Sequence, residues 1–272
     1  MKIAIHQTKI VFEDKEKNYN TAKKAIQLAS KYHVNFIVFP EMSFTGFSMN
    51  VNKVGEESQE TIQYIKKIAV ENRISIGFGW VKKIEEQNKV IGENHYSIIN
   101  QNGQVISDYI KCHPFSYAQE DEYYLKGTQI TYCEMNEFHV SSTICYDLRF
   151  PELYQAISKK SDLILVPANW PMSRRSQWIT LLQARAIENQ CYIIGANCCG
   201  EINGLTYSGD SCIIHPSGKI IETTEDNDLL MADIINDVVT IRSEFPVRKD
   251  RRETFYQNLY TNQELMVKYN EE

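Results

Sequence analysis

An order of apolar runs that occurs twice along the chain limits the possible folds more than any other feature of the sequence. Short runs rich in β-branched residues, bounded by polar segments, are typical of buried strands. In the first half they occupy 2–7, 35–41 and 74–81, followed by a hairpin over 95–110 that turns at Asn102-Gly103. In the second half they occupy 139–147, 162–170 and 191–199, followed by 209–224 with a turn at Ser217-Gly218. The shared order and hairpin position favour an internal repeat over the alternation common to all α/β proteins.

Helix-like segments separate the first three of these runs. Apolar residues recur at helical spacing in 18–33 and in 58–72. Possible N-caps are Asn18 or Asn20 in the first segment and Ser58 or Thr61 in the second. Alternating strands and helices predict a mixed or mainly parallel sheet with helices outside. We therefore predict an α/β fold: a four-layer α-β-β-α sandwich with an internal pseudo-two-fold repeat.

The chain shows no interdomain linker, so we predict one domain over 1–272. The segment from about Val239 lacks the repeated pattern, and we expect it to wrap the surface or to reach a partner subunit. The net charge of −6 argues against a nucleic-acid-binding surface. No apolar stretch approaches the ~20 residues that span a bilayer, and the first ten residues contain no apolar signal sequence. We expect a cytoplasmic protein that contacts neither membrane nor nucleic acid.

The seven cysteines do not form a disulfide or zinc framework. Their number is odd, no C-x-x-C occurs, and the adjacent pair Cys198-Cys199 does not have the usual spacing of zinc ligands. We therefore expect no metal. Cys145, at the end of a predicted strand, is then either a buried thiol or a nucleophile.

Polar residues follow several predicted strands at the point where each strand ends. They are Glu41, Lys111, Cys145 and Asn169. In α/β sheets functional residues gather at the carboxyl ends of strands, so these four are expected to converge. Taken singly, Cys145 is equally well a core thiol, Glu41 a solvated acid and Lys111 a surface lysine. Their joint placement at the ends of strands favours a functional site formed by all of them.

A catalytic thiol needs a base, and its ordinary partner is histidine. None of the six histidines lies in a known cysteine-protease signature. A carboxylate serves as base if burial raises its pKa, and Glu41 directly follows an apolar strand. A lysine such as Lys111 would stabilise the oxyanion that forms when the thiol attacks a carbonyl.

Three segments resemble the signature segments of the nitrilase superfamily, the carbon–nitrogen hydrolases. They are "FPEMSFTGF" (39–47), "YIKCHPFSYAQEDEYYLKG" (109–127) and "STICYDLRFPELY" (141–153), in the order that this family has. The resemblance implies an α-β-β-α sandwich with a Glu–Lys–Cys triad, no cofactor, and often a homodimer. It runs over nearly the whole chain.

The resemblance implies a role for each matching residue. Glu41 would be the general base, Cys145 the nucleophile and Lys111 the oxyanion stabiliser, with the Tyr146 backbone N–H completing the oxyanion hole. A second glutamate positions the substrate or the lysine in many members; we assign it to Glu120, with Glu122 as the alternative. Arg185 and Glu188 are expected to form a structural pair.

Within the family, "PANWP" and the "R-x-x-FP" tail are most similar to the ω-amidase branch. Those enzymes hydrolyse the terminal amide of short dicarboxylate monoamides such as 2-oxoglutaramate. The substrate carboxylate needs a cation. Candidates are Arg149, which alternatively pairs with Asp147 or Glu152, and Arg174, whose neighbour Arg175 competes for the same role. Possible pocket walls, or ordinary core aromatics, are Phe44, Phe47, Trp170 and Tyr146.

Three rival functions remain open on the sequence. The first is a carbon–nitrogen hydrolase acting on N-carbamoyl amines, aliphatic amides or nitriles. The second is a non-catalytic binding protein of the same fold. The third is a redox protein that uses Cys198-Cys199.

Overall fold

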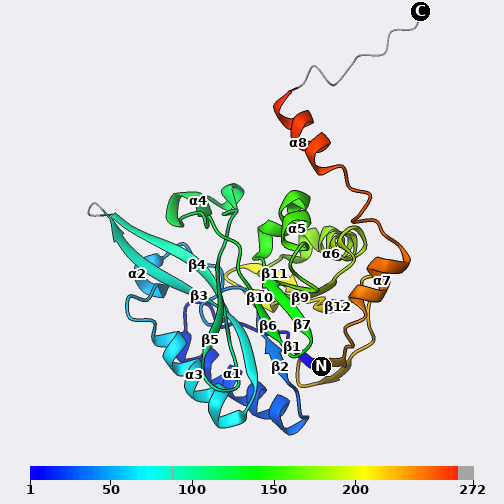
Figure 1. Cartoon of the computed structure of the whole chain (residues 1–272). Coiled ribbons are helices and arrows are strands. Elements are labelled where there is room, and N and C mark those ends of the chain that lie inside the picture. Colours follow the sequence, from blue (N-terminus) through cyan, green and yellow to red (C-terminus); the bar gives the residue numbers. More distant parts are fainter. Residues whose placement is uncertain (87–88, 263–272) are drawn as a thin grey trace, which may run out of the picture.

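A computed structural model describes residues 1–86 and 89–262, and in it two β-sheets lie face to face between layers of helices (Figure 1). The first sheet has the order β13 (Thr224–Asp226), β14 (Leu229–Asp233), β1 (Lys2–His6), β2 (Phe36–Val38), β3 (Ser75–Glu86), β4 (Lys89–Ile99), β5 (Val105–Ile110). The second has the order β12 (Cys212–Ile214), β9 (Tyr192–Asn197), β8 (Leu163–Ala168), β7 (Phe138–Ser142), β6 (Tyr132–Met135). β10 (Cys199–Ile202) and β11 (Leu205–Ser208) form a separate hairpin.

The two sheets repeat one pattern of strand directions, which confirms the predicted repeat. In the first, β1, β2 and β3 are parallel, and β14 and β4 flank them antiparallel. In the second, β7, β8 and β9 are parallel, flanked by the antiparallel β6 and β12. The carboxyl ends of the central strands therefore carry equivalent positions in the two halves.

Three buried clusters correspond to the three interfaces between layers. Inward side chains of both sheets, including Ile5, Val38, Leu165 and Ile194, form the central one. α1 (Lys15–Lys31) and α3 (Glu60–Asn72) cover the first sheet. α5 (Pro151–Ile157) and α6 (Arg175–Asn189) cover the second. The predicted four-layer α-β-β-α sandwich is the observed fold.

Both predicted helix starts were wrong. α1 is capped by Asp14, whose side chain accepts from the Lys17 N–H, so neither Asn18 nor Asn20 is the cap. Asn18 is buried inside the helix, where its amide donates to the carbonyls of Val11 and Phe44 and holds the neighbouring loops.

α3 has Gln59 at its N-cap position, so neither Ser58 nor Thr61 caps it. Thr61 lies in the first turn, and its N–H donates to the buried carboxylate of Glu56. A carboxylate from outside the helix satisfies a donor that a cap residue normally takes.

The second hairpin is shorter than predicted. Its turn falls at Ser217-Gly218 as expected, closed by the bond from the His215 N–H to the Lys219 carbonyl. Beyond one bridge between Ile214 and Ile220, however, the returning chain leaves β12. Thr224 instead pairs with β14 in the other sheet, because the β13–β14 hairpin extends that sheet beyond β1.

The segment after β14 forms two helices, α7 (Val238–Glu244) and α8 (Glu253–Thr261). Arg242 fixes α7 to the body by donating to the carbonyls of Ser161 and Gln190. α8 extends from the sandwich (Figure 1), and Tyr260 donates to Glu152 on α5. The rest of the predicted tail, 263–272, lies outside the described residues. No helix in the described part has the length and apolar character needed to cross a membrane.

Candidate active site

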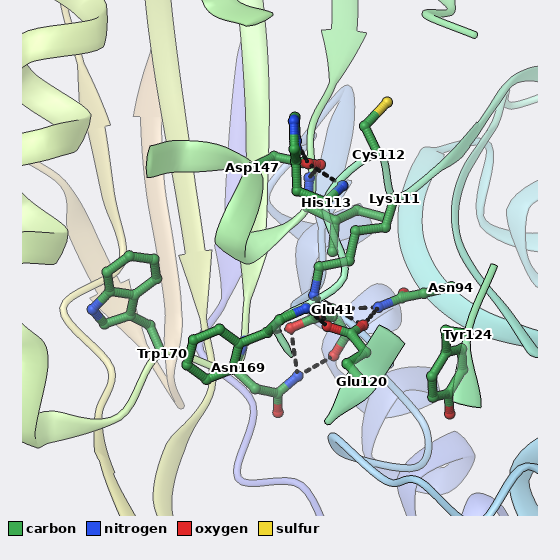
Figure 2. A network of polar contacts seen from close by, with 12 residues as sticks. Glu41, Asn94, Lys111, Cys112, His113, Glu120, Tyr124, Asp147, Asn169 and Trp170 are labelled. Carbon is green, nitrogen blue, oxygen red and sulfur yellow. Dashed lines mark hydrogen bonds and ion pairs between the residues drawn. The ribbon is translucent and has the colours of Figure 1, made fainter. Parts of the chain in front are cut away.

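Glu41, Lys111 and Glu120 meet in a buried cluster where the strands of the first sheet end (Figure 2). Glu41 follows β2, Lys111 follows β5, and Glu120 opens the short helix α4 (Glu120–Tyr123). The Lys111 ammonium lies 2.8 Å from Glu41 Oε1 and 2.8 Å from Glu120 Oε2, and all three side chains are at most 1% exposed. Three charges this deeply buried are stable only because they pair with one another.

Two asparagines complete the hydrogen bonding of this cluster. Asn94, on β4, donates to Glu41 Oε1 at 2.9 Å and to Glu120 Oε1 at 3.1 Å. Asn169 follows β8 in the second sheet; its backbone N–H donates to Glu41 Oε2 at 3.0 Å and its side-chain amide donates to the Glu41 carbonyl. Both carboxylate oxygens of Glu41 therefore accept hydrogen bonds, from residues of both sheets.

The environment sets the protonation of the cluster. Burial raises the pKa of Glu41, but the Lys111 charge and the donors around it outweigh burial and leave that pKa below its usual value. Burial also lowers the pKa of Lys111, yet the two carboxylates hold it well above its usual value. Burial, with the Glu41 charge, leaves the pKa of Glu120 raised despite the nearby Lys111. The resting cluster thus holds an ammonium and an ionised Glu41, and Glu120 takes up a proton more readily than Glu41.

Cys145 stands on a sharp turn beside this cluster. The chain leaves β7 and enters a 3-10 turn over Cys145–Arg149, where Cys145 itself has a positive φ of 46°. A non-glycine residue rarely adopts this backbone conformation, and such strain persists only where the surroundings enforce it. Burial and the Glu41 charge, opposed by Lys111, raise the pKa of the Cys145 thiol well above its usual value. The resting sulfur is therefore a neutral thiol.

Asp147 enforces that turn. Its fully buried carboxylate accepts from the Ile144 N–H and the Tyr109 hydroxyl, both at 2.8 Å, and from the backbone N–H of His113 at 3.0 Å. The His113 ring contacts the same carboxylate at 2.7 Å and stacks on Phe150. Asp147 thereby ties the Cys145 turn to the chain that carries Lys111 (Figure 2).

A cavity of about 340 Å³ opens onto Cys145, Glu41 and Lys111. The candidates Phe47, Tyr146, Arg149, Trp170 and Arg174 all line it. Phe44 does not line it: that ring lies in the core between the first sheet and its helices. From the sequence, a phenylalanine three positions after Glu41 could lie in the cavity or in the core, and its packing places it in the core.

The arginine alternatives are now separated. Arg149 does not pair with Asp147 or Glu152; it donates to Gln177 at 2.6 Å and its guanidinium lies 4.8 Å from the Trp170 ring. Arg174 lies 5.4 Å from the Phe115 ring at the cavity wall.

Arg175 pairs with Asp210 at 2.6 Å and is not among the residues that line the cavity.

Glu120 is in the buried cluster, whereas Glu122 is exposed. Arg185 pairs with Glu188 as expected and also donates to the Leu148 carbonyl inside the Cys145 turn.

Cys198 and Cys199 have separate partners. The buried Cys198 thiol donates to Asn169 Oδ1 at 3.3 Å, and Cys199 contacts the Gln7 carbonyl at 3.2 Å. Across the described residues, no group of three or more His, Cys, Asp or Glu side chains is arranged to hold a metal ion.

Sequence reasoning missed Asn94 and Tyr207. Asn94 is a polar residue inside the apolar run of β4, an irregularity that could have been noticed. Tyr207 lies on β11 and lines the cavity, but nothing in its sequence context separates it from a surface tyrosine.

Comparison with known proteins agrees with this geometry. The family described as carbon-nitrogen hydrolase matches residues 2–242. The chain is 32% identical over 263 residues to the hydrolase in agr operon of Staphylococcus aureus, which covers 94% of this chain and 100% of that protein. It is 31% identical over 259 residues to the 2-oxoglutaramate amidase of Bacillus subtilis, covering 93% of this chain and 98% of that protein.

A solved structure has the same fold. The CN-hydrolase superfamily protein from Xanthomonas campestris, which carries an arsenic adduct in its active site, superposes with a TM-score of 0.82 at 26% identity. The superposition covers 92% of this chain and 97% of that one. The resemblance noted in the sequence is confirmed, and the chain belongs to the carbon–nitrogen hydrolase family.

Proposed function

We propose that this protein hydrolyses the terminal amide of small dicarboxylate monoamides, of the 2-oxoglutaramate or 2-oxosuccinamate type, to the acid and ammonia. The observation that carries the proposal is the cavity that joins Cys145 and the buried Glu41–Lys111 pair to two arginines. The first three supply amide chemistry, and the arginines supply the charge that a substrate carboxylate needs.

Each residue has one role in the proposed reaction. Cys145 is the nucleophile and Glu41 the general base. Lys111 and the backbone N–H of Tyr146 stabilise the oxyanion. Glu120, which contacts the Lys111 ammonium through both oxygens, holds the lysine in place.

The reaction proceeds through a thioester. Glu41 takes the thiol proton as Cys145 Sγ bonds to the amide carbon, and the carbonyl oxygen becomes an oxyanion. When the carbon–nitrogen bond breaks, the leaving nitrogen takes the proton from Glu41 and departs as ammonia. Glu41 then removes a proton from water, whose oxygen attacks the thioester. The carbon–sulfur bond breaks, and the sulfur recovers the proton from Glu41.

The pKa directions constrain the first step. The pKa of Cys145 is raised and that of Glu41 is lowered, so a free thiolate is disfavoured in the resting site. Proton transfer therefore accompanies attack on the carbonyl and does not precede it, since the developing oxyanion compensates for the lost carboxylate charge.

The substrate class rests on size and charge. A cavity of about 340 Å³ is at the small end of ligand sites, which suits a short acyl chain. The similarity to the 2-oxoglutaramate amidase of Bacillus subtilis, at 31% identity, supports the same class. Arg149 and Arg174 are proposed to receive the substrate carboxylate, with Phe47 and Trp170 as walls.

Ammonia release from a substrate panel tests the proposal. The panel is 2-oxoglutaramate, 2-oxosuccinamate, glutamine, asparagine, a plain aliphatic amide and an N-carbamoyl amine. We expect turnover of the two 2-oxo monoamides, and its loss in Cys145→Ala. Cysteine-dependent turnover of another panel member alone would keep the mechanism and reject the substrate class.

A further inference from the structure

Tyr207 lines the same cavity from the hairpin of β10 and β11. The β11 strand pairs antiparallel with β10, which places Tyr207 opposite Gly200. The ring of Tyr207 packs in a small apolar cluster with Ile10, Cys198 and Ile202, and the residue is 5% exposed. The ring is therefore fixed by packing, and the side chain contributes to the cavity wall.

The hydroxyl of Tyr207 differs from those of the other buried tyrosines in the described part of the chain. Each of the others hydrogen-bonds within the protein: Tyr96 to the Phe39 carbonyl, Tyr109 to Asp147, Tyr124 to the Ser48 carbonyl, Tyr154 to Thr143 and Tyr192 to the Ile235 carbonyl. The Tyr207 hydroxyl has no hydrogen-bond partner among residues 1–86 and 89–262. It is not one of the fully buried polar atoms that lack a partner in the described residues, so it is open to the cavity, where an oxygen of a bound substrate can accept from it.

The surroundings of that hydroxyl fit an oxygen acceptor on the substrate. Burial, together with the groups Cys198, Cys145 and Glu41, raises the pKa of Tyr207, while Arg174 opposes this shift. The phenol is thus a neutral donor at physiological pH, and Cys145 and Arg174 line the same cavity as Tyr207. The Arg174 guanidinium also has no hydrogen bond or ion pair with any residue that the structure describes. Two residues whose side-chain donors form no hydrogen bond within the described part of the chain, Tyr207 and Arg174, therefore line one cavity.

We propose that the Tyr207 hydroxyl donates a hydrogen bond to an oxygen on the acyl part of the substrate, its carboxylate or 2-oxo group, beside Arg174. This makes Tyr207 a specificity-determining residue, and it rests on the proposed function. Arg149 is less suited to share this role because Gln177 and Trp170 already hold its guanidinium. A site built to donate to a substrate oxygen discriminates against analogues that lack it, because its own donor is then left unpaired.

Three amides that differ only in the carboxylate and 2-oxo groups test the assignment. They are 2-oxoglutaramate, with both groups; glutaramate, with the carboxylate alone; and butyramide, with neither. The variant Tyr207→Phe removes only the hydroxyl and keeps the packed ring. The matched control is Tyr132→Phe, which removes the same group from a 52% exposed tyrosine on β6 that is not among the residues lining the cavity.

In Tyr207→Phe we expect kcat/KM to fall about 10- to 100-fold for the acidic substrates and to stay within about 2-fold for butyramide, from the usual strength of a hydrogen bond to a charged group. A loss on glutaramate assigns the bond to the carboxylate, and a loss confined to 2-oxoglutaramate assigns it to the 2-oxo group. Tyr132→Phe should leave kcat/KM unchanged for all three substrates.

Two results would overturn the inference. In the first, the wild-type enzyme prefers the acidic substrates, but Tyr207→Phe changes kcat/KM for none of the three amides. This result would reject the role of Tyr207 and leave the proposed function standing. The other is an equal loss on all three, which would give the hydroxyl a role unrelated to specificity. A wild-type enzyme without preference for the acids would instead reject the proposed substrate class and the inference together.

Discussion

Glu41 accepts hydrogen bonds on both carboxylate oxygens, and this explains how a buried acid stays ionised next to a thiol. Lys111 and Asn94 donate to Oε1, and the Asn169 N–H donates to Oε2. A carboxylate with several donors favours its charged form even when it is desolvated. The same bonds fix its orientation, so the proposed base is already positioned before a substrate binds.

Asn94 should matter for the reaction although it does not contact the cavity. It donates to both Glu41 and Glu120, so Asn94→Ala loosens the two acids relative to Lys111. We expect kcat to fall about 10- to 100-fold with a smaller change in KM, as for the loss of a preorganised donor. The control is Asn20→Ala, at an exposed position on α1. Unchanged kcat in Asn94→Ala would contradict this positioning role.

His95 predicts a pH dependence of stability. Its ring lies between Asp108, at 2.9 Å, and Glu93, at 3.1 Å; burial lowers its pKa, but the two acids leave that pKa above 6.5. The charged ring therefore adds stability fully below pH 6.5, and this stability is lost as pH rises through the folded pKa. Denaturant titrations should show unfolding free energy falling above pH 6.5 in the wild type.

In His95→Gln that fall should largely disappear, because the titrating group is gone. The exposed His33→Gln is the control and should keep the wild-type profile. An identical profile in His95→Gln would show that other groups cause the pH dependence.

For single residues, the sequence predicted the triad together with Glu120 and Asn169, but it did not predict Asn94 or Tyr207. Glu41, Lys111 and Cys145 could be found because each ends a strand, and strand ends converge by the rule of parallel sheets. Asn94 and Tyr207 could not, since their importance comes from distances between segments far apart in the chain. Whether Arg149 or Arg174 receives a carboxylate likewise depends on what each already bonds.

The turn that carries Cys145 is held by elements on both sides. Asp147 joins it to the end of β5 through Tyr109 and His113, and Arg185 on α6 donates to the Leu148 carbonyl. A strained residue needs such support, because the free energy stored at its positive φ must be offset nearby. The sequence predicted Arg185 as a structural residue, and its bond to the turn supplies the reason.

Asp147→Asn should therefore weaken the whole turn. An amide cannot accept from all four donors, and its NH₂ group faces some of them, so we expect a loss of about 2–4 kcal/mol in unfolding free energy. Activity should fall at least about 10-fold because the proposed nucleophile shifts. The exposed Glu152→Gln is the control. Full activity of a stable Asp147→Asn would contradict the role of Asp147 in holding the Cys145 turn.

Strands with a strong apolar pattern of their own were predicted from the sequence. Strands whose formation depends on pairing with a neighbouring strand were not. The hairpin at Asn102-Gly103 and the central strands follow from their own residues. β13 contains no apolar residue, and β6 and β14 are runs of only four and five residues whose pairing is decided by the neighbouring strands of the sheet. This is also why the second predicted hairpin extends for only one bridge.

The whole molecule depends on burial between the two sheets. Leu165, on the central strand β8, is fully buried in that interface. Leu165→Ala should lower the unfolding free energy by about 2–5 kcal/mol, from lost burial and the cavity left behind. Val239→Ala, at an exposed site on α7, should change it by less than about 0.5 kcal/mol. Equal effects in the two variants would contradict the assignment of the core.

The extended α8 bears on the proposed homodimer. Phe255, Tyr256 and Tyr260 are exposed on this helix, which contacts the body at few points. We propose that a second copy of the chain covers these exposed aromatic side chains of α8. Sedimentation velocity should then show a species of twice the 31.6 kDa chain mass. The variant Phe255→Asp should shift it toward the single chain. A single-chain mass across the micromolar range would reject the dimer.

Acid-quenched mass spectrometry of the full chain during turnover of 2-oxoglutaramate tests the central claim most directly, that Cys145 carries the acyl group. We expect an added acyl mass on the peptide that contains Cys145, and neither this mass nor ammonia release in Cys145→Ala. An acyl group on another residue, or wild-type ammonia release by Cys145→Ala, would contradict it.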